Sequence, residues 1–146
     1  LIGNETQAPA GIYVTSRFQG GVAVTGNTLS GTGAEYRGIW VDYGPNTGTV
    51  IEGNTISDVQ HCFSAENTND VVFRGNTCAN IGDRGVQWVA GSLGGQITGN
   101  TFVGPTPPRD WIWIQDGAAA TVEENDFPGS PETGTISSTG AESSIT

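Results

Sequence analysis

Asp42 and Glu66 are the residues of this chain whose types and spacing best suit acid–base chemistry. Each follows one copy of a short alternating segment, 38–41 and 61–64, so we expect the two carboxylates on adjacent levels of one surface. Two carboxylates at such a separation perturb each other's pKa, and they could divide the acid role and the nucleophile or base role of a glycosidase. With backbone carbonyls, the same pair could instead bind Ca²⁺.

His61 and Arg84 offer a second chemistry, together with Arg37, because these three residues precede successive copies of the same segment. β-Elimination from a uronate needs a proton acceptor and a positive charge that neutralises the carboxylate, and His and Arg can supply both. The predicted catalytic residues are therefore Asp42, His61, Glu66 and Arg84. The alternative is that they are solvated charges in surface ion pairs of little energy.

An aromatic strip is expected beside these charges, on the outward positions of the alternating segments. The strip consists of Tyr13, Trp40, Phe63, Gln87 and Trp113. Exposed aromatic residues in register form an apolar surface that needs a partner, and sugar rings stack on such planes. With Arg37 and Tyr43 at its edges, the strip is the predicted carbohydrate-binding surface. The alternatives are that its rings pair with one another across strands, or that a loop or a partner subunit covers them.

The elements that position these residues follow from a repeated turn sequence, Gly-Asn-Thr. The repeat places asparagines 23, 27, 22, 24 and 25 residues apart, a spacing typical of a solenoid. These asparagines are Asn4, Asn27, Asn54, Asn76, Asn100 and Asn125. We expect the Asn to tolerate the left-handed backbone conformation at a tight turn, and the preceding Gly to relax the same bend. Stacked Asn side chains should also bond backbone groups of adjacent coils.

Three short strands are predicted for each repeat: one before the Asn, one after it, and the alternating segment that follows. The alternation has the period of two that a half-buried strand shows. Six copies give an all-β fold, a right-handed parallel β-helix of about six coils over residues 1–136. Residues 137–146 are rich in Ser, Thr and Gly, so we expect a tail or the start of a cap there. The chain begins without Met in strand-like sequence, which favours a segment of a longer protein.

The two cysteines, Cys62 and Cys78, are expected to point into the interior, where a thiol behaves as a small apolar group. They fall on neighbouring coils but on different predicted faces, so two buried thiols are expected more than a disulfide. Because side chains alternate along a strand, assigning Cys62 and Ser64 to the interior assigns Phe63 to the outer face. No metal site with Cys or His ligands is expected, since His61 is the only histidine and no CxxC motif occurs.

A leucine-rich repeat is an alternative architecture at this period. Leu occurs only at Leu1, Leu29 and Leu93, and the second half of each repeat alternates like a strand instead of following a helical stripe. The β-helix is therefore the better prediction.

Composition bears on the class of partner. The formal net charge is −10, from 15 acidic residues and five Arg with no Lys, which does not suit a protein whose main partner is nucleic acid. No apolar run is long enough to form a membrane-spanning helix. An acidic composition without Lys suits an extracellular setting.

The recurring pattern Ile-x-Gly-Asn-Thr-Ile followed by Gly-Ile-x-Val resembles the repeats of the pectate-lyase-like superfamily over essentially the whole chain. In members that act on sugars, the substrate lies along the outer face of one sheet, which would correspond here to the Gly-Ile-x-Val segments. The resemblance implies an extracellular, cell-surface or virion protein that binds a polysaccharide or surface glycan. If it is an enzyme, it would be a polysaccharide lyase or glycoside hydrolase, with Ca²⁺ as the one cofactor to consider. The resemblance equally allows a structural segment of a phage tail or fibre, a surface adhesin or a filament, with other copies or flanking domains at the solenoid ends.

Overall fold

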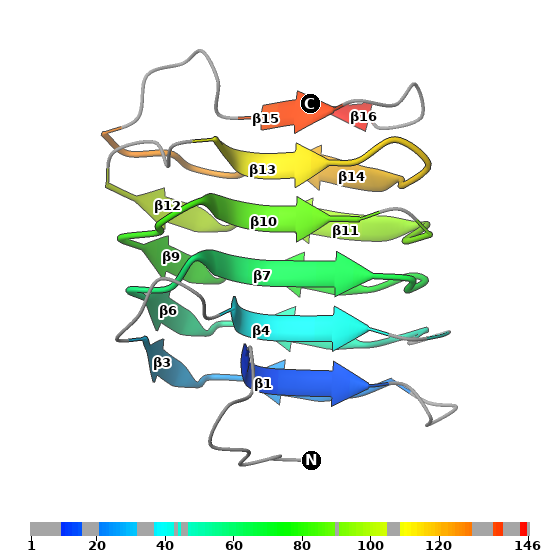
Figure 1. Ribbon diagram of the computed structural model, residues 1–146, viewed down its shortest axis with the longest axis horizontal. Helices are drawn as coiled ribbons and strands as arrows, with labels where there is room; N and C mark the ends of the chain where they lie inside the picture. Colours follow the sequence, from blue (N-terminus) through cyan, green and yellow to red (C-terminus); the bar gives the residue numbers. More distant parts are fainter. Residues whose placement is uncertain are drawn as a thin grey trace.

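The computed structural model describes residues 10–15, 21–31, 37–42, 44, 47–89, 91–104, 109–129, 136–138 and 144–145. These residues form short strands that pair in parallel in three sheets, and the chain visits the sheets in turn as it winds upward (Figure 1). No helix long and apolar enough to cross a membrane occurs in these ranges.

Sheet A is the face turned to the viewer in Figure 1. Its strands, in spatial order, are β1 (Ala10–Thr15), β4 (Arg37–Asp42), β7 (His61–Glu66), β10 (Arg84–Trp88), β13 (Asp110–Ile114) and β15 (Ile136–Ser138). Each of these strands corresponds to one of the alternating segments that the sequence predicts.

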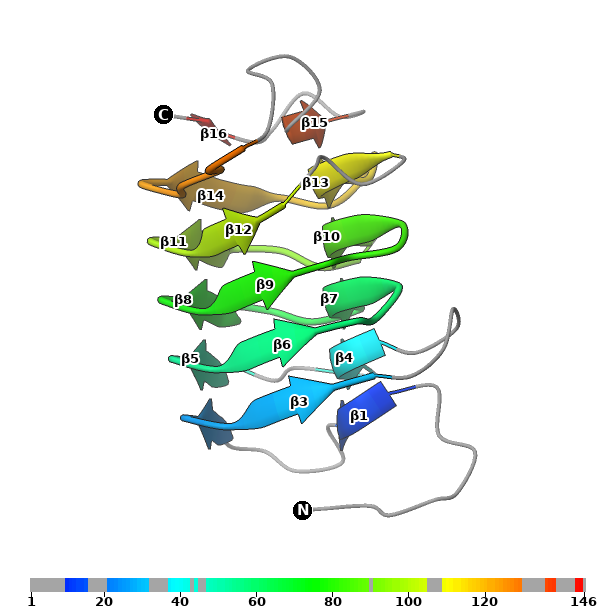
Figure 2. The same cartoon turned by 90° about the vertical axis from the view of Figure 1, so that its left-hand side faces the viewer.

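Sheets B and C form the rest of the coil (Figure 2). Sheet B contains β2 (Ala23–Thr25), β5 (Val50–Glu52), β8 (Val72–Arg74), β11 (Gly95–Thr98), β14 (Ala120–Glu123) and β16 (Ser144–Ile145). Sheet C contains β3 (Thr28–Ser30), β6 (Thr55–Ser57), β9 (Thr77–Ala79) and β12 (Thr101–Val103). The predicted arrangement of one strand before the Asn, one after it and one further along is confirmed. A strand in the second half of each repeat also decides against a leucine-rich repeat.

The solenoid has about four complete turns among the described residues, so the prediction of six is wrong. Sheet C stops at β12, whereas sheets A and B continue to β15 and β16. After Asn125 the repeat degenerates to Asp126-Phe127-Pro128, and a single bridge between Thr101 and Asp126 takes the place of a third strand. Pro128 has no N–H to donate to a ladder, which opposes a strand at this level.

Two strands lie in the part of the chain where a tail or cap is expected. Ser137 and Ser138 belong to β15, which pairs with β13, and β16 pairs with β14. Sheets A and B therefore extend beyond residue 136.

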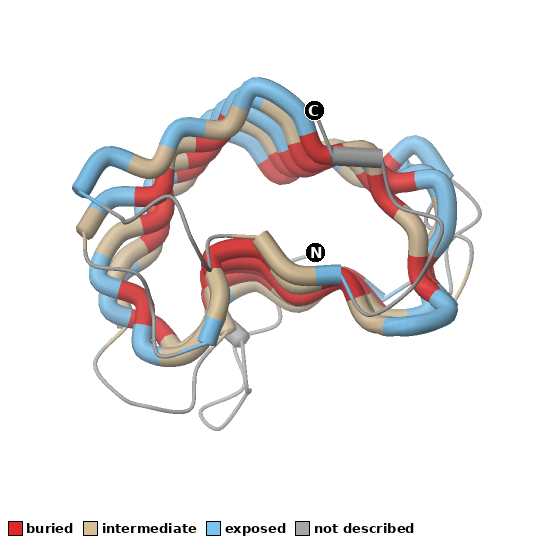
Figure 3. The backbone as a smooth tube through the Cα atoms, turned by 90° about the horizontal axis from the view of Figure 1, so that it is seen from above, coloured by how far each residue is buried: buried red, intermediate tan, exposed pale blue. Residues whose placement is uncertain are grey.

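The interior is lined by the apolar positions that the repeat predicts, and buried positions recur from coil to coil (Figure 3). The fully buried large side chains include Ile39, Ile51, Ile56, Phe73, Ile97, Phe102, Ile112 and Ile114. Stacking like residues on like keeps each strand in register, because a one-residue slip would move this set to the solvent side.

In the Gly-Asn-Thr turns, the residue that adopts the left-handed conformation is not the one predicted. The left-handed conformation is adopted by the glycine, with φ values of 66° at Gly26, 63° at Gly53 and 60° at Gly75, and not by the Asn that follows. Glycine meets no Cβ penalty there. The degenerate copy carries Glu124 at the same place with φ 55°, a conformation that L side chains rarely adopt.

The asparagines form a continuous hydrogen-bonded ladder, as predicted. In each step the backbone N–H and the side-chain amide of one Asn donate to Oδ1 of the Asn in the next coil, for example Asn54 to Asn76 at 2.9 Å in both bonds. The same amide also donates to carbonyl oxygens, such as that of Val24 from Asn54. The ladder runs from Asn27 through Asn100 to Asn125. It satisfies backbone groups at a corner where no strand pairing can do so.

Cys62 and Cys78 form a disulfide with their Cα atoms 5.8 Å apart, so the expectation of two buried thiols is wrong. Cys62 lies near the start of β7 and Cys78 at the centre of β9, where sheets A and C adjoin, and both are fully buried. Side chains from two sheets converge at this corner, which alternation along one strand does not reveal. A disulfide is compatible with an oxidising extracellular environment.

Reduction of this disulfide should lower the free energy of unfolding by about 3 kcal/mol, the entropy effect of closing a loop of this length in the unfolded chain. The two cysteines are separated by 16 residues. Urea denaturation with and without reductant measures the difference. The Cys62→Ala/Cys78→Ala double variant should be indifferent to the same reductant. Two titratable thiols in the denatured but unreduced protein would contradict the bond.

Candidate functional site

The outer face of sheet A carries most of the side chains that the sequence selects for function. The pairing register aligns one outward residue from each of five successive strands, namely Tyr13, Trp40, Ser64, Gln87 and Trp113. Tyr13, Trp40 and Trp113 are partly exposed, and the Tyr13 and Trp40 rings lie 4.6 Å apart. Aromatic rings therefore occupy both ends of this column, with two small polar positions between them.

Phe63 does not belong to this column, and its assignment to the carbohydrate-binding strip is wrong. It is fully buried, and its ring stacks on that of Phe73 with centroids 4.6 Å apart. In the sheet it pairs with Ile39 and Val86, which are both core residues.

Ser64 takes the outward place that was assigned to Phe63. It pairs with Trp40 on one side and Gln87 on the other, and neighbouring side chains cover it completely. The displacement arises because Cys62 and Phe63 are both buried in succession at the corner where β7 begins. Strict alternation from Cys62 therefore reverses the two faces of this strand.

Three basic side chains stand in register at the starts of β4, β7 and β10: Arg37, His61 and Arg84. The guanidinium carbon of Arg37 lies 4.3 Å from the centroid of the Trp40 ring, and that of Arg84 lies 4.0 Å from the Trp113 ring. Both are cation–π contacts. The arginines thus lie flat against the face, with only 25% and 12% of their side-chain surfaces exposed.

The two candidate carboxylates are neighbours, as predicted. Asp42 pairs directly with Glu66, and Oε1 of Glu66 is 3.2 Å from Nη2 of Arg37. Burial raises the pKa of Glu66, and Asp42 raises it further while Arg37 opposes the rise. Asp42 itself is only 1% exposed. A glycosidase needs both carboxyl groups at the sugar, and a covered Asp42 does not reach one in this conformation.

His61 is held in its neutral form. Burial, the largest cause, lowers its pKa to about 4, helped by the charges of Arg37 and Arg84 and opposed by Asp83, whose Oδ2 is 3.8 Å from Nε2. The side-chain amide nitrogen of Gln87 lies 3.3 Å from the same Nε2. A base with this pKa is poorly matched to proton abstraction at neutral pH.

Asp83, Arg109 and Asp110 complete the network, and the sequence reasoning missed all three. Nε of Arg109 is 3.2 Å from Oδ1 of Asp83, and Nε of Arg84 is 3.9 Å from Oδ2 of Asp110. Asp110 pairs with Arg84 and so occupies the register position of the basic column. Aligning the first residue of each alternating segment, and not only its centre, would have found it.

This face also contains most of the buried side-chain N and O atoms that have no hydrogen-bond partner. Of the seven such atoms among the described residues, five lie here: Arg37 Nε, Trp40 Nε1, His61 Nδ1, Ser64 Oγ and Arg84 Nε. The carboxylate of Glu66 lies near the Trp40 indole N–H, and the Arg84 carbonyl near the His61 ring, but neither contact meets hydrogen-bond geometry. Buried polar groups are usually hydrogen-bonded, so a cluster of such groups without hydrogen bonds makes this face a candidate binding site.

An ion pair on sheet B, between Arg74 and Glu52, serves as a comparison because it lies on the exposed surface. Nε and Nη2 of Arg74 donate to the two carboxylate oxygens of Glu52 at 3.0 and 3.1 Å, with the two side chains 51% and 46% exposed. Apart from Arg109, which is 59% exposed, the charged side chains of the sheet A network are only 12–25% exposed. Their interactions are correspondingly less screened by water.

The remaining predictions concern Tyr43 and Ca²⁺. Tyr43 lies outside the described residues. In the part of the chain that the structure describes, no third His, Cys, Asp or Glu joins Asp42 and Glu66 in a group that could hold a metal ion.

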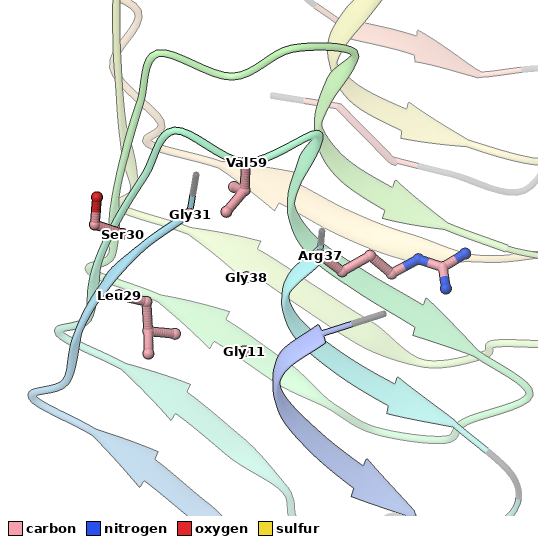
Figure 4. A pocket seen from close by; sticks show the side chains of 7 residues that line it. All are labelled: Gly11, Leu29, Ser30, Gly31, Arg37, Gly38 and Val59. Carbon is pink, nitrogen blue, oxygen red and sulfur yellow. The ribbon is translucent and has the colours of Figure 1, made fainter. Parts of the chain in front are cut away.

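A pocket of about 190 Å³ opens beside the first coils and is separate from the column (Figure 4). It is lined by Gly11, Leu29, Ser30, Gly31, Arg37, Gly38 and Val59. Its walls are mainly apolar, and the Arg37 side chain extends from it toward the outer face. The described neighbours of this pocket supply no second charged group, so we place no chemistry there.

Comparison with known proteins supports the architecture. No curated protein and no solved structure matches the chain. A family model described as the right handed beta helix region matches residues 3–146, which is nearly the whole chain. With its parallel three-sheet coils and Asn ladder, the chain belongs to the right-handed β-helix family.

Proposed function

We propose that the outer face of sheet A binds a carbohydrate chain. The observation that carries the proposal is the combination, on one face, of partly exposed aromatic rings with five buried side-chain N and O atoms that make no hydrogen bond within the protein. Sugars need both features, because their C–H faces pack on aromatic planes while each hydroxyl must keep its hydrogen bonds.

The ligand would lie across the strands, parallel to the solenoid axis. Tyr13 and Trp113 stand at the ends of a column of five strands, and four steps of about 4.8 Å give a length of about 19 Å. A column of this length favours an oligosaccharide over a single sugar.

The buried polar atoms without hydrogen bonds favour a rearrangement of this face on binding, because the ligand can supply the missing bonds. Ser64 Oγ and Trp40 Nε1 are covered and have no hydrogen-bond partner in the protein. A buried group without a partner is costly by about 1–3 kcal/mol. Rotation of the Arg37–Trp40 stack would uncover these groups for ligand hydroxyls and recover that free energy.

Binding is better supported than cleavage. Asp42 is covered, and His61 has a pKa of about 4, so the predicted acid–base residues are poorly placed for hydrolysis or elimination at neutral pH. We therefore propose a binding module and keep catalysis by Asp42, His61, Glu66 and Arg84 as the hypothesis that a turnover assay would test.

A structural role is the second candidate, and one observation favours it. The rings of the column already have partners within the sheet, since Tyr13 contacts Trp40 at a tilt of 36° and two guanidinium groups cover Trp40 and Trp113. A solenoid segment of a fibre, adhesin or filament could present such a face to another chain.

Replacing Trp40 by Ala should weaken oligosaccharide binding at least tenfold, the equivalent of about 1.4 kcal/mol, because one of the three aromatic rings of the column is removed. A glycan panel followed by titration calorimetry measures the affinity. The matched control is Leu93→Ala, since Leu93 is a large apolar residue that is 48% exposed outside sheet A. Absence of binding across the panel, or an equal loss in the control, would count against the carbohydrate hypothesis and in favour of the structural one.

A further inference from the structure

Among the described residues, each arginine on the outer face of sheet A already has a carboxylate of the protein beside it. Arg37 pairs with Glu66 at 3.2 Å, Arg109 with Asp83 at 3.2 Å, and Arg84 approaches Asp110 at 3.9 Å. Three arginines therefore face three carboxylates.

The other titratable groups of this face do not add positive charge. His61 is held neutral by burial and by the two flanking guanidinium groups. Asp42, which pairs with Glu66 in the sheet, brings a fourth acidic residue. The formal net charge of the whole chain is −10, so its long-range field repels polyanions.

We propose, on the basis of the carbohydrate-binding function above, that the ligand is an uncharged, hydroxyl-rich glycan and not a polyuronate or another anionic chain. An anionic ligand bound through arginine needs the guanidinium fork that a carboxylate or phosphate occupies. Here the protein's own carboxylates compete for that fork.

An uncharged glycan can hydrogen-bond to these arginine–carboxylate pairs without breaking them. Each pair places N–H donors beside carboxylate acceptors, and a sugar hydroxyl both donates and accepts. The pair of Arg37 and Glu66 offers a donor and an acceptor side by side, and Trp40, against which the guanidinium lies, belongs to the aromatic column. Such hydrogen bonds to charged groups are stronger than those between neutral groups.

The test is to release one cation from its carboxylate. In the wild-type protein, neutral oligosaccharides should bind at least tenfold more tightly than oligouronates of the same length. That affinity should change less than threefold between low and high salt, because no net ion pair forms. Glu66→Gln keeps the shape of the side chain but leaves Arg37 without its partner. This variant should gain at least fivefold in oligouronate affinity, and the gain should disappear at high salt.

Glu52→Gln is the matched control, because it releases Arg74 from an Arg–Glu pair on the exposed surface of sheet B, away from the proposed binding face. It should not gain oligouronate binding, and both variants should keep the wild-type far-ultraviolet circular dichroism spectrum. Tight, salt-sensitive binding of oligouronates by the wild-type protein would overturn the inference while leaving the carbohydrate-binding function intact. Failure of both kinds of oligosaccharide to bind would instead remove the proposed function itself.

Discussion

Replacing Phe63 by Ala should lower the free energy of unfolding by about 3–5 kcal/mol, the range for emptying a large buried aromatic site. Phe63 is fully buried, with its ring 4.6 Å from that of Phe73 and 5.9 Å from that of Trp88. Both neighbours are themselves fully buried, so little can move to fill the space. Chemical denaturation at equilibrium measures the effect.

Ser64→Ala is the matched control on the adjacent position. Its hydroxyl is buried and has no partner, so its removal should be nearly neutral or slightly stabilising. Simple alternation from Cys62 places Phe63 at the surface and Ser64 in the interior, and so predicts a larger loss of unfolding free energy for Ser64→Ala than for Phe63→Ala. A loss below about 1 kcal/mol for Phe63→Ala, typical of surface substitutions, would show that the register of β7 is the one that alternation predicts.

The second large effect is expected at the centre of the Asn ladder, where Asn76→Ala should lower the free energy of unfolding by about 4 kcal/mol. Oδ1 of Asn76 accepts from the backbone N–H of Asn54, and its amide donates to the carbonyl of Ile51. The substitution leaves the buried N–H of Asn54 without its acceptor, which costs about 1–3 kcal/mol, and it also removes the bonds from the Asn76 amide to Ile51, Arg74 and Asn100. Thermal and urea unfolding measure the loss.

Asn27→Ala provides the comparison within the same ladder. Asn27 is partly exposed, and the substitution removes its amide bonds to the exposed carbonyl of Thr25 and to Oδ1 of Asn54. Oδ1 of Asn54 keeps its bond from the backbone N–H of residue 27, and water can replace the bond to Thr25, so the loss should stay below about 1.5 kcal/mol. Equal losses at Asn27 and Asn76 would mean that the ladder contributes nothing beyond local turn formation.

The architecture could be predicted from the sequence because the same repeat occurs several times along the chain. A single copy of Gly-Asn-Thr is weak evidence, but copies at nearly constant spacing align the apolar positions of every coil. The number of turns was not accessible in the same way. The last copies keep the Asn while losing the third strand, because pairing in sheet C depends on backbone donors that the motif does not specify.

The outer side of sheet A was predicted from the sequence as the candidate functional face, but the residues on it changed. Tyr13, Trp40, Gln87 and Trp113 do align there. Phe63 does not, because a side chain at a corner between two sheets can point inward without regard to alternation. Asp110 could have been found by aligning the starts of the strands, whereas Asp83 meets Arg109 only across coils and could not.

The sequence by itself determined the coil, the inward and outward positions of most strands, and the face that carries most of the aromatic and charged candidate residues. These properties are local and repeated, so the same few residues specify them in every coil. Only the tertiary structure decided the disulfide, the burial of Phe63 and the pairing of arginines with carboxylates on that face. Each of these depends on which side chains of different coils or sheets meet, and that is set by the corner geometry of the folded solenoid.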